Sequence, residues 1–233
     1  MGKAILRIRN LTKIYRTEDS IVRAVNDITL DIQQGESCAV VGTSGSGKST
    51  LVNLVAGLER PTAGEIFIGD RSIHAMSESR LADFKLCNIG VVFQKDNLFM
   101  AMTMQENVAF VLAAKGYPRP LRLQMAEEML ENTGLGKYLK HKPGQLSELQ
   151  QQRAAIARAL IGTPRILLAD EPAGDLDSHT AQEIMELFDR EVKARGITFL
   201  FVTHDMEKAK SADRIFHITD GRIEKSTQRL ENG

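Results

Sequence analysis

The segment "GTSGSGKST" combines glycines, small hydroxyl side chains and one lysine at a spacing suited to phosphate binding. It matches the pattern G-x-x-x-x-G-K-[ST], follows the apolar run "SCAVV" and leads into the helical pattern "STLVNLVAGL". Glycines let the backbone turn so that successive N–H groups and the helix N-terminus face phosphate oxygens. We therefore expect the whole segment to bind a nucleotide: Gly42, Thr43, Ser44, Gly45, Ser46, Gly47, Lys48, Ser49 and Thr50.

Two side chains of this loop have separate chemistry. The Lys48 ammonium suits the β- and γ-phosphates, and the Ser49 hydroxyl suits a magnesium ion. The alternative is a flexible glycine turn, but the pattern arises by chance in about one chain per hundred of this size. The strand and helix on either side lower those odds further, so the sequence predicts nucleotide binding.

Polar side chains also follow three other apolar runs. "RILLADEP" ends in Asp170, which can hold magnesium through water, and Glu171, which can polarise a water for attack on the γ-phosphate. The alternative makes both acids solvated turn residues before Pro172, which is hard to reconcile with two acids at the end of an apolar strand. His204 after "TFLFVT" and Gln94 after "IGVVF" are either polar strand ends or further contacts, Gln94 as a ligand for magnesium and the attacking water.

The patterning around these motifs predicts an α/β fold. "AILRIRNL" and "VRAVNDITLDI" alternate apolar and polar residues, which is typical of an antiparallel pair of half-buried strands. Continuous apolar runs alternate with helical stretches such as "AQEIMELFDREVKARG", which predicts a mostly parallel sheet. The Asp-Gly turn in "DRIFHITDGRIEK" indicates a hairpin.

One domain is expected, with a helical subdomain inserted into it. Residues 97–160 contain helix-forming stretches and no strand run, so we divide the chain into an α/β core (1–96 and 161–233) and this subdomain. The charges balance, with 30 Lys plus Arg and 30 Asp plus Glu, which gives no field that recruits nucleic acid. Cys38 and Cys87 have no metal-ligand spacing and are expected to be reduced. No stretch approaches the roughly 20 apolar residues of a membrane span, so membrane association would require a partner.

Six motifs in order resemble those of the ATP-binding cassette (ABC) family, the nucleotide-hydrolysing subunits of ABC transporters. They are Tyr15, "GTSGSGKST", "VVFQ", "LSELQQQRAAIARAL", "RILLADEPAGDLDS" and "FVTHD", and the match extends over nearly the whole chain. The resemblance implies a P-loop NTPase (RecA-like) core, ATP and Mg²⁺ as ligands, and hydrolysis of ATP to ADP and phosphate. ABC relatives that act on DNA usually carry long coiled coils, which this sequence lacks.

The same resemblance assigns roles to individual residues. Tyr15 would stack on adenine, although an ordinary amphipathic strand residue explains it equally well. Gln94 would sense magnesium and the membrane partner, Glu171 would be the general base and His204 would contact the γ-phosphate. Asp177, in "GDLDS", would lie in the loop that crosses to the opposite subunit.

Two longer stretches resemble the branch that serves lipoprotein release and macrolide-type export: "YRTEDSIVRAVNDITLDI" and "FQKDNLFMAMTMQENV". Members work as a pair of ATPase subunits, here expected to be identical, under a permease that is separate or fused. We expect an unfused permease and a cytoplasmic location on the inner face of the cell membrane. Phe99, Met100, Met102 and Met104 would either receive the permease or form subdomain core.

One motif departs from the family. The signature Leu-Ser-Gly-Gly-Gln is replaced by Leu146, Ser147, Glu148, Leu149 and Gln150. Ser147 with Gln150 forms a capping-box pattern and Glu148 suits the first turn of a helix, so a helix should start here. In the resembling site, Ser147, Glu148 and Gln150 would contact ATP bound to the partner subunit, where a carboxylate 4 Å from a phosphate charge costs roughly 4 kcal/mol at an effective dielectric near 20.

That cost exceeds the roughly 0.3 to 1 kcal/mol that a helix dipole returns, and Leu149 adds bulk, so we expect a weak ATP-driven dimer and slow hydrolysis. Three origins fit: a natural low-turnover subunit, a heteromeric pair whose other member has an intact signature, or a deliberate change that blocks closure. The alternative function is an ATP-responsive structural or regulatory subunit with little hydrolysis. A GTPase or kinase is disfavoured because no Asn-Lys-x-Asp motif occurs.

Overall fold

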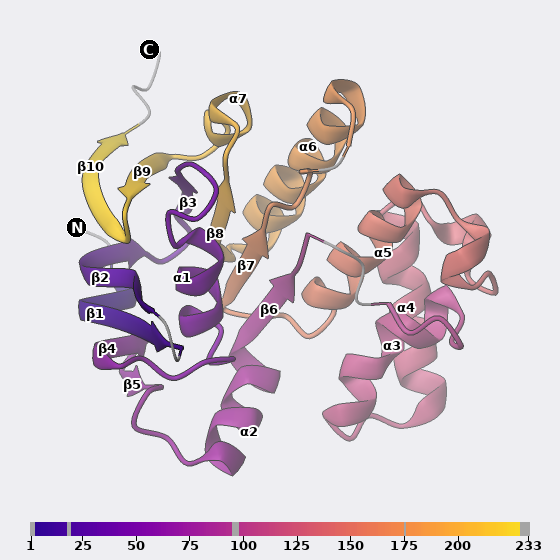
Figure 1. Ribbon diagram of the computed structural model, residues 1–233. Helices are drawn as coiled ribbons and strands as arrows, with labels where there is room; N and C mark the ends of the chain where they lie inside the picture. The colour runs from indigo at the N-terminus through magenta and orange to yellow at the C-terminus, as the bar shows by residue number, and fades with distance from the viewer. Residues whose placement is uncertain (1–2, 18–19, 95–97, 175, 229–233) are drawn as a thin grey trace.

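A computed structural model describes residues 3–17, 20–94, 98–174 and 176–228, and it contains two sheets (Figure 1). The first is four-stranded and antiparallel, in the order β2-β1-β4-β5. Its strands are β1 (Ala4–Arg16), β2 (Ile21–Gln33), β4 (Ala63–Ile68) and β5 (Arg71–Ser72). The expected antiparallel opening is confirmed by the pairing of β1 with β2, whereas β4 and β5 were not anticipated from the sequence.

The second sheet is six-stranded and mostly parallel, in the order β10-β9-β3-β8-β7-β6. Parallel pairs join β6 to β7, β7 to β8, β8 to β3 and β3 to β9, as the alternation of apolar runs and helices predicts. Only β10 runs antiparallel, as the second strand of the expected hairpin. The strands are β3 (Ser37–Val41), β6 (Ile89–Val92), β7 (Ile166–Asp170), β8 (Thr198–Thr203), β9 (Arg214–Thr219) and β10 (Arg222–Gln228).

The central sheet separates two hydrophobic cores. Alternate residues of each central strand face opposite sides: Ala39 and Phe201 enter the core shared with the helices of residues 104–195, while Val40 and Val202 enter the core shared with the antiparallel sheet. Both faces are therefore buried, which is why β3, β7 and β8 are continuously apolar in sequence. The helices that cover the sheet are α1 (Lys48–Val55), α2 (Glu78–Asn88), α6 (Ser178–Arg195) and the short α7 (Met206–Ala209).

The remaining helices gather beyond the β6 edge of the central sheet (Figure 1). Thr103 with Glu106 and Ser147 with Gln150 form capping boxes at the starts of two of them, the second as its sequence predicts. These helices are α3 (Met104–Ala114), α4 (Arg119–Asn132) and α5 (Glu148–Leu160), with the 3-10 turns η1 (Gly136–Tyr138) and η2 (Pro143–Gln145). Within the described part of the chain, no helix has the length and apolarity needed to cross a membrane.

Candidate functional site

The phosphate loop connects β3 to α1, and its glycines are required by the backbone. Gly45 and Gly47 have φ angles of +78° and +101°, in the left-handed region that other residues rarely adopt. A Cβ atom at Gly47 would lie 2.0 Å from the carbonyl oxygen of Ala24, and one at Gly42 would lie 2.4 Å from that of Ile218. The loop is thus packed against neighbouring backbone, which holds its N–H groups around the start of α1.

Lys48 is the first residue of α1, and it is only 7% exposed. Its Nζ donates to the carbonyl oxygens of Gly42, at 2.9 Å, and Thr43, at 2.8 Å. Among the residues that the structure describes, no carboxylate lies within ion-pair distance of it. The described hydrogen-bond partners of this buried ammonium are both neutral, and the charge of Asp170 acts on it only through space, so the cradle fits an anion such as a nucleotide phosphate.

Ser49 and Asp170 meet beside the loop, as the sequence predicts for two magnesium ligands. The Ser49 hydroxyl donates to Oδ1 of Asp170 at 3.0 Å. Burial raises the pKa of the Asp170 carboxyl above its usual range, and the charge of Glu171 raises it too, while the Ser49 hydrogen bond and Lys48 act in the opposite direction. A hydroxyl and a carboxylate oxygen side by side are donors that Mg²⁺ accepts.

Glu171 lies directly after β7 in a strained and largely buried position. It is 9% exposed, and its φ of +47° is in the left-handed region. Its Oε1 lies 2.9 Å from Nδ1 of His204, whereas its Oε2 is buried and has no hydrogen-bond partner among the residues that the structure describes. A carboxylate held on one oxygen and unpaired on the other can accept a proton from a bound water.

Gln94 is placed differently from Ser49 and Asp170. A Cβ atom built on Gly174 would lie 3.3 Å from its Nε2, so the amide is beside the turn that follows Glu171. The structure therefore groups Gln94 with Glu171, whereas the direct contact of the predicted magnesium ligands is between Ser49 and Asp170.

Tyr15 lies on β1 near the start of α1. Its hydroxyl donates to Oε2 of Glu59 at 2.6 Å, and Nζ of Lys13 lies 5.0 Å from its ring centroid. Burial and the Glu59 hydrogen bond raise the pKa of the phenol, while a hydrogen bond with Thr50 of the phosphate loop lowers it. The ring is 36% exposed. It is thus anchored beside the loop with surface available for a flat ligand.

The signature segment forms the start of α5. Ser147 Oγ accepts from the backbone N–H of Gln150, and Oε1 of Gln150 accepts from the backbone N–H of Ser147. Glu148 is exposed, whereas Leu149 is half-buried and packs against the larger core. The side chain of Leu149 thus contributes to the core of its own subunit, and the effect of its bulk on a close approach by a partner stays a prediction.

Asp177 caps the start of α6 and accepts from the backbone N–H groups of His179 and Thr180, both at 3.1 Å. The hydrogen bonds with Thr180 lower the pKa of this carboxyl. Asp177 therefore has a local structural task, in addition to any contact with another subunit.

Two residues near Glu171 were not anticipated from the sequence. Nε2 of Gln152 donates to the carbonyl oxygen of Pro172 at 2.8 Å, and Nζ of Lys208 donates to that of Ala173 at 2.7 Å. Gln152 stands in the polar run "QQQR" and Lys208 in a charged stretch, so nothing in the sequence distinguished either residue from its neighbours. Both contact the backbone after Glu171, so they belong to the site.

Comparisons with known proteins agree with this geometry. The family model described as ABC transporter matches residues 25–174. The chain is 40% identical to the lipoprotein-releasing system ATP-binding protein LolD of Syntrophotalea carbinolica, over 95% of this chain and 98% of that protein. It is 40% identical to the macrolide export ATP-binding/permease protein MacB of Aggregatibacter actinomycetemcomitans, over 97% of this chain but 35% of that longer protein.

A solved structure is also similar. The ATP-binding cassette MJ0796, in a dimeric post-hydrolysis state bound to ADP and Pi, superposes with a TM-score of 0.90 at 37% identity. The similarity covers 97% of this chain and 99% of that one. These findings match the expected family and the expected branch.

The contact between Ser49 and Asp170 can be used to test whether the ionised carboxylate of Asp170 lowers folding stability while it serves metal binding. Because the pKa of Asp170 is higher in the folded chain than in the unfolded one, its ionised form lowers the free energy of unfolding, increasingly as pH rises through the raised pKa. Asp170→Asn keeps the acceptor for Ser49 and cannot ionise. Without nucleotide it should melt at a higher temperature than the parent at pH 7, and the difference should vanish near pH 3.

The same variant should lose the extra thermal stabilisation that Mg²⁺ adds to ATP over ATP with EDTA. Asp83→Asn, at an exposed position on α2, is the control and should behave as the parent in both measurements. A lower melting temperature for Asp170→Asn at neutral pH, or an unchanged response to Mg²⁺, would contradict this account.

Proposed function

The chain belongs to the ABC transporter family as an ATP-binding and ATP-hydrolysing subunit, and from this premise we propose how its residues work and what the subunit drives. The observation that carries the proposal is the combination of a buried Lys48 that has no ion-pair partner and a carboxylate, Glu171, that has one oxygen without a hydrogen bond, both among the residues that the structure describes. The first suits binding of the terminal phosphates. The second suits activation of water.

In this proposal the chain's own groups divide the reaction between them. The phosphate loop binds the triphosphate, with the Lys48 ammonium moving from backbone carbonyls to the β- and γ-phosphates. Ser49 and Asp170 would hold Mg²⁺, which would neutralise phosphate charge. Tyr15 stacks on adenine, and Gln94, beside Gly174, orients the attacking water and senses the metal.

Glu171 is the general base. Its Oε2 accepts the proton of the attacking water, while His204 holds Oε1 in place and contacts the γ-phosphate. Oε2 is buried and has no hydrogen-bond donor among the described residues, so no protein contact competes with a water brought to it when the nucleotide binds. The strained φ of Glu171 is consistent with a side chain that is positioned for chemistry.

The wider assembly follows the family. We propose that two identical subunits pair head to tail, with Asp177 in the crossing loop, beneath a membrane permease that is a separate chain. The subunit would then lie in the cytoplasm on the inner face of the membrane, with residues 97–160 as a helical subdomain that faces the permease. The similarity to LolD and MacB supports lipoprotein release or macrolide-type export as the process.

Replacement of Glu171 by glutamine tests the general base. Glu171→Gln keeps the shape of the side chain and removes the base, so steady-state ATP hydrolysis should fall by about a hundredfold or more while MgATP binding persists. Lys48→Ala is the companion variant and should lose both hydrolysis and most of the MgATP affinity. Parental turnover in Glu171→Gln would exclude the role, and unchanged affinity in Lys48→Ala would exclude the phosphate site.

Glu148, which replaces the first glycine of the family's signature, is the reason that we expect slow hydrolysis. Glu148 is exposed at the first turn of α5, and among the described residues its carboxylate has no hydrogen bond or ion pair that would have to break before it met a second subunit's ATP. Since Leu149 packs against its own core, Glu148 is the principal obstacle to closure. We propose that the dimer forms weakly on ATP and that hydrolysis is slow. The alternative, a regulatory subunit with little hydrolysis, is favoured by the same residue.

Reversion at position 148 tests this obstacle. Glu148→Gly should raise ATPase activity and ATP-dependent dimerisation together, by about tenfold, because it removes the repulsion between the carboxylate and the phosphate. The gain is smaller than the full Coulomb energy because the side chain can relax away from the phosphate. Glu148→Gln keeps the size without the charge and should recover most of that gain if charge is the cause. Leu149 is left unchanged because a glycine there would lose core packing.

Dimerisation is measured by gel filtration with ATP in a Glu171→Gln background, where hydrolysis does not disperse the dimer. Glu128→Gln, on the exposed side of α4, is the control and should change nothing. If Glu148→Gly and Glu148→Gln both stay at the parental level, the carboxylate is only part of a helix cap and the regulatory alternative gains support.

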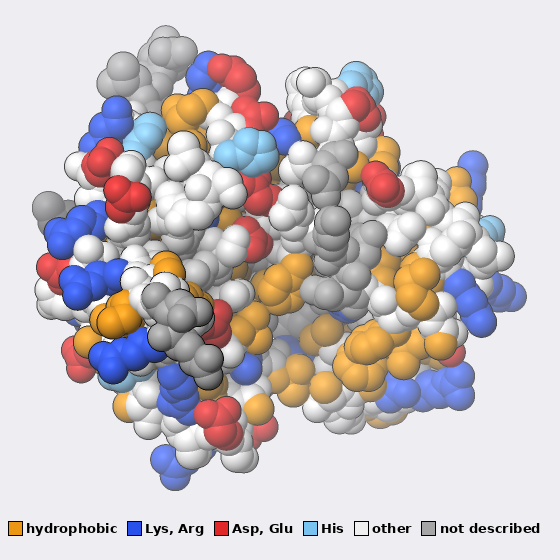
Figure 2. Space-filling model, in the orientation of Figure 1, with side chains coloured by type: hydrophobic (Ala, Val, Ile, Leu, Met, Phe, Trp, Pro, Cys, Tyr) orange, Lys and Arg blue, Asp and Glu red, His pale blue; other side chains and the backbone are white. Residues whose placement is uncertain are grey.

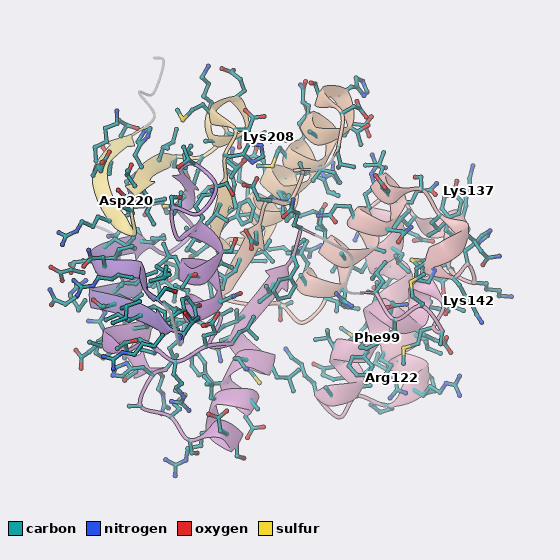
Figure 3. All side chains as sticks on the ribbon, viewed as in Figure 1. Phe99, Arg122, Lys137, Lys142, Lys208 and Asp220 are labelled. Carbon is teal, nitrogen blue, oxygen red and sulfur yellow. The ribbon has the colours of Figure 1, made fainter. Side chains whose placement is uncertain are left out.

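The expected permease surface divides in two. Phe99 and Met100 are exposed, by 41% and 60%, and the Phe99 ring packs on Phe110 with centroids 4.7 Å apart. Met104, by contrast, is fully buried in the core, so it does not form part of any docking surface. Figure 2 shows apolar side chains gathered over α3 and α4, and Figure 3 places Phe99 and Arg122 on that side.

A buried asparagine shapes the loop that presents these side chains. Asn107 is fully buried; its Oδ1 accepts from the Phe99 N–H at 2.7 Å, and its Nδ2 lies within hydrogen-bond distance of three carbonyl oxygens. A groove of about 270 Å³ adjoins the loop. It is lined by Met102, Glu106, Ala109, Phe110, Ala113, Arg119, Arg122 and Leu123. We propose that this loop and groove receive the permease.

Acidic substitutions test the docking surface. Phe99→Asp and Met100→Asp should each abolish co-purification of the chain with its permease from detergent-solubilised membranes, because a carboxylate would be buried against apolar groups. MgATP affinity should stay parental in both variants. The melting temperature should stay parental in Met100→Asp, whose side chain is 60% exposed, and should fall slightly in Phe99→Asp, which loses its packing on Phe110. Leu58→Asp, at a site that is 49% exposed and follows α1, is the matched control. Intact co-purification of both acidic variants would refute the docking proposal.

A further inference from the structure

The four residues that follow β7, residues 171–174, form a turn that we call the Glu171 turn. The backbone N–H of Glu171 donates to Val202 on β8 at 3.0 Å, and that of Gly174 donates to the Glu171 carbonyl oxygen at 3.0 Å. The two carbonyl oxygens between them, of Pro172 and Ala173, have side-chain donors from elsewhere in the chain. Every backbone carbonyl from Glu171 to Ala173 is therefore hydrogen-bonded.

The two side-chain donors come from helices on different sides of the turn. Gln152, in the middle of α5, is 5% exposed and donates to Pro172 at 2.8 Å. Lys208, on α7, donates to Ala173 at 2.7 Å, and its side chain is 16% exposed. Figure 3 shows Lys208 beside α7, on the side of α6. Lys208 also lies 3.7 Å from Asp205, the N-cap of α7, but its shorter contact is the hydrogen bond to the Ala173 carbonyl oxygen in the turn.

The turn needs such support because Glu171 has a conformation that a non-glycine residue adopts only under constraint. Its φ is +47°, and its Oε2 is buried without a partner, so neither the backbone nor the side chain is at a local optimum. Without the two donors, rotation of the peptide groups after Glu171 would relieve the strain and move the carboxylate away from His204.

We propose that Gln152 and Lys208 are positioning residues that hold the Glu171 turn, and through it the Glu171 carboxylate, in the geometry required for ATP hydrolysis. The proposal rests on the proposed role of Glu171 as general base. Gln152 also connects the Glu171 turn to the signature segment, because both Gln152 and that segment belong to α5. The hydrogen bond between Arg153 and Glu183, at 2.6 Å, fixes the same part of α5 to α6. The signature helix and the catalytic carboxylate are thus joined within one subunit.

The test compares paired substitutions at the two positions. Lys208→Met keeps the aliphatic length and removes the donor, Lys208→Arg keeps a donor, and Gln152→Leu replaces the amide by an apolar group of similar size. For Lys208→Met and Gln152→Leu we expect kcat for ATP hydrolysis to fall on the order of ten- to a hundredfold, as for a misplaced catalytic group. KM for ATP and MgATP affinity should change by less than about twofold. Lys208→Arg should recover most of the rate.

Two matched controls separate positioning from general stability. Lys210→Met removes an exposed lysine that pairs with Glu207 on the same helix, and Gln182→Leu removes an exposed amide of α6 that bonds Glu186. Both should keep parental kcat. If Lys210→Met slows hydrolysis as much as Lys208→Met, or if Lys208→Met and Gln152→Leu lose MgATP affinity in step with kcat, the two residues are merely structural and the inference is overturned.

A double substitution shows whether the residues act through Glu171. Adding Lys208→Met or Gln152→Leu to Glu171→Gln should cause no further loss in the residual single-turnover rate, because the group being positioned is already gone. Fully additive losses would overturn the inference. Parental turnover in Glu171→Gln alone would overturn the proposed base instead. Loss of turnover in Glu171→Gln with parental kcat in Lys208→Met and Gln152→Leu would overturn only the positioning role.

Discussion

Parallel pairing of three buried strands is the constraint on which the rest of this structure depends. β3, β8 and β7 run in one direction, with Val41 opposite Thr203 and Val202 opposite Asp170, so their carboxyl ends reach one edge of the sheet together. The phosphate loop, Glu171 and His204 each follow the end of one of these strands. The phosphate loop thus meets Glu171 and His204, which lie more than a hundred residues later in the chain. The register of the sheet alone brings these segments together.

The site that forms at this edge stores unfavourable electrostatics. A buried ammonium has only carbonyl partners, a carboxyl has a pKa raised by burial, and a second carboxylate has an unpaired oxygen. Each of these costs folding free energy, and each would be relieved by a magnesium-bound phosphate or a water. The two large cores on either side of the sheet provide the stability that offsets these costs.

The signature segment is favourable for the start of its own helix and, in our proposal, unfavourable for the approach of a second subunit's ATP. Ser147 and Gln150 complete a capping box, and an acid in the first turn suits the helix dipole, so the start of α5 is locally well formed. The proposed penalty arises only when a second phosphate approaches that carboxylate. A favourable local choice and an unfavourable intermolecular one thus coexist in the same residue, Glu148.

The sequence by itself determined the elements whose causes are local: the glycine loop, the apolar strands, the Asp-Gly hairpin and the capping box at Ser147. Each rests on backbone preferences or hydrogen bonds within a few residues. Tertiary structure alone decided that Leu149 and Met104 pack inward, that Gln94 lies by Gly174, and that the turn after Glu171 takes donors from α5 and α7. These facts depend on contacts between segments tens of residues apart, and the spacing of residue types along one chain carries no record of which side chain fills a given space.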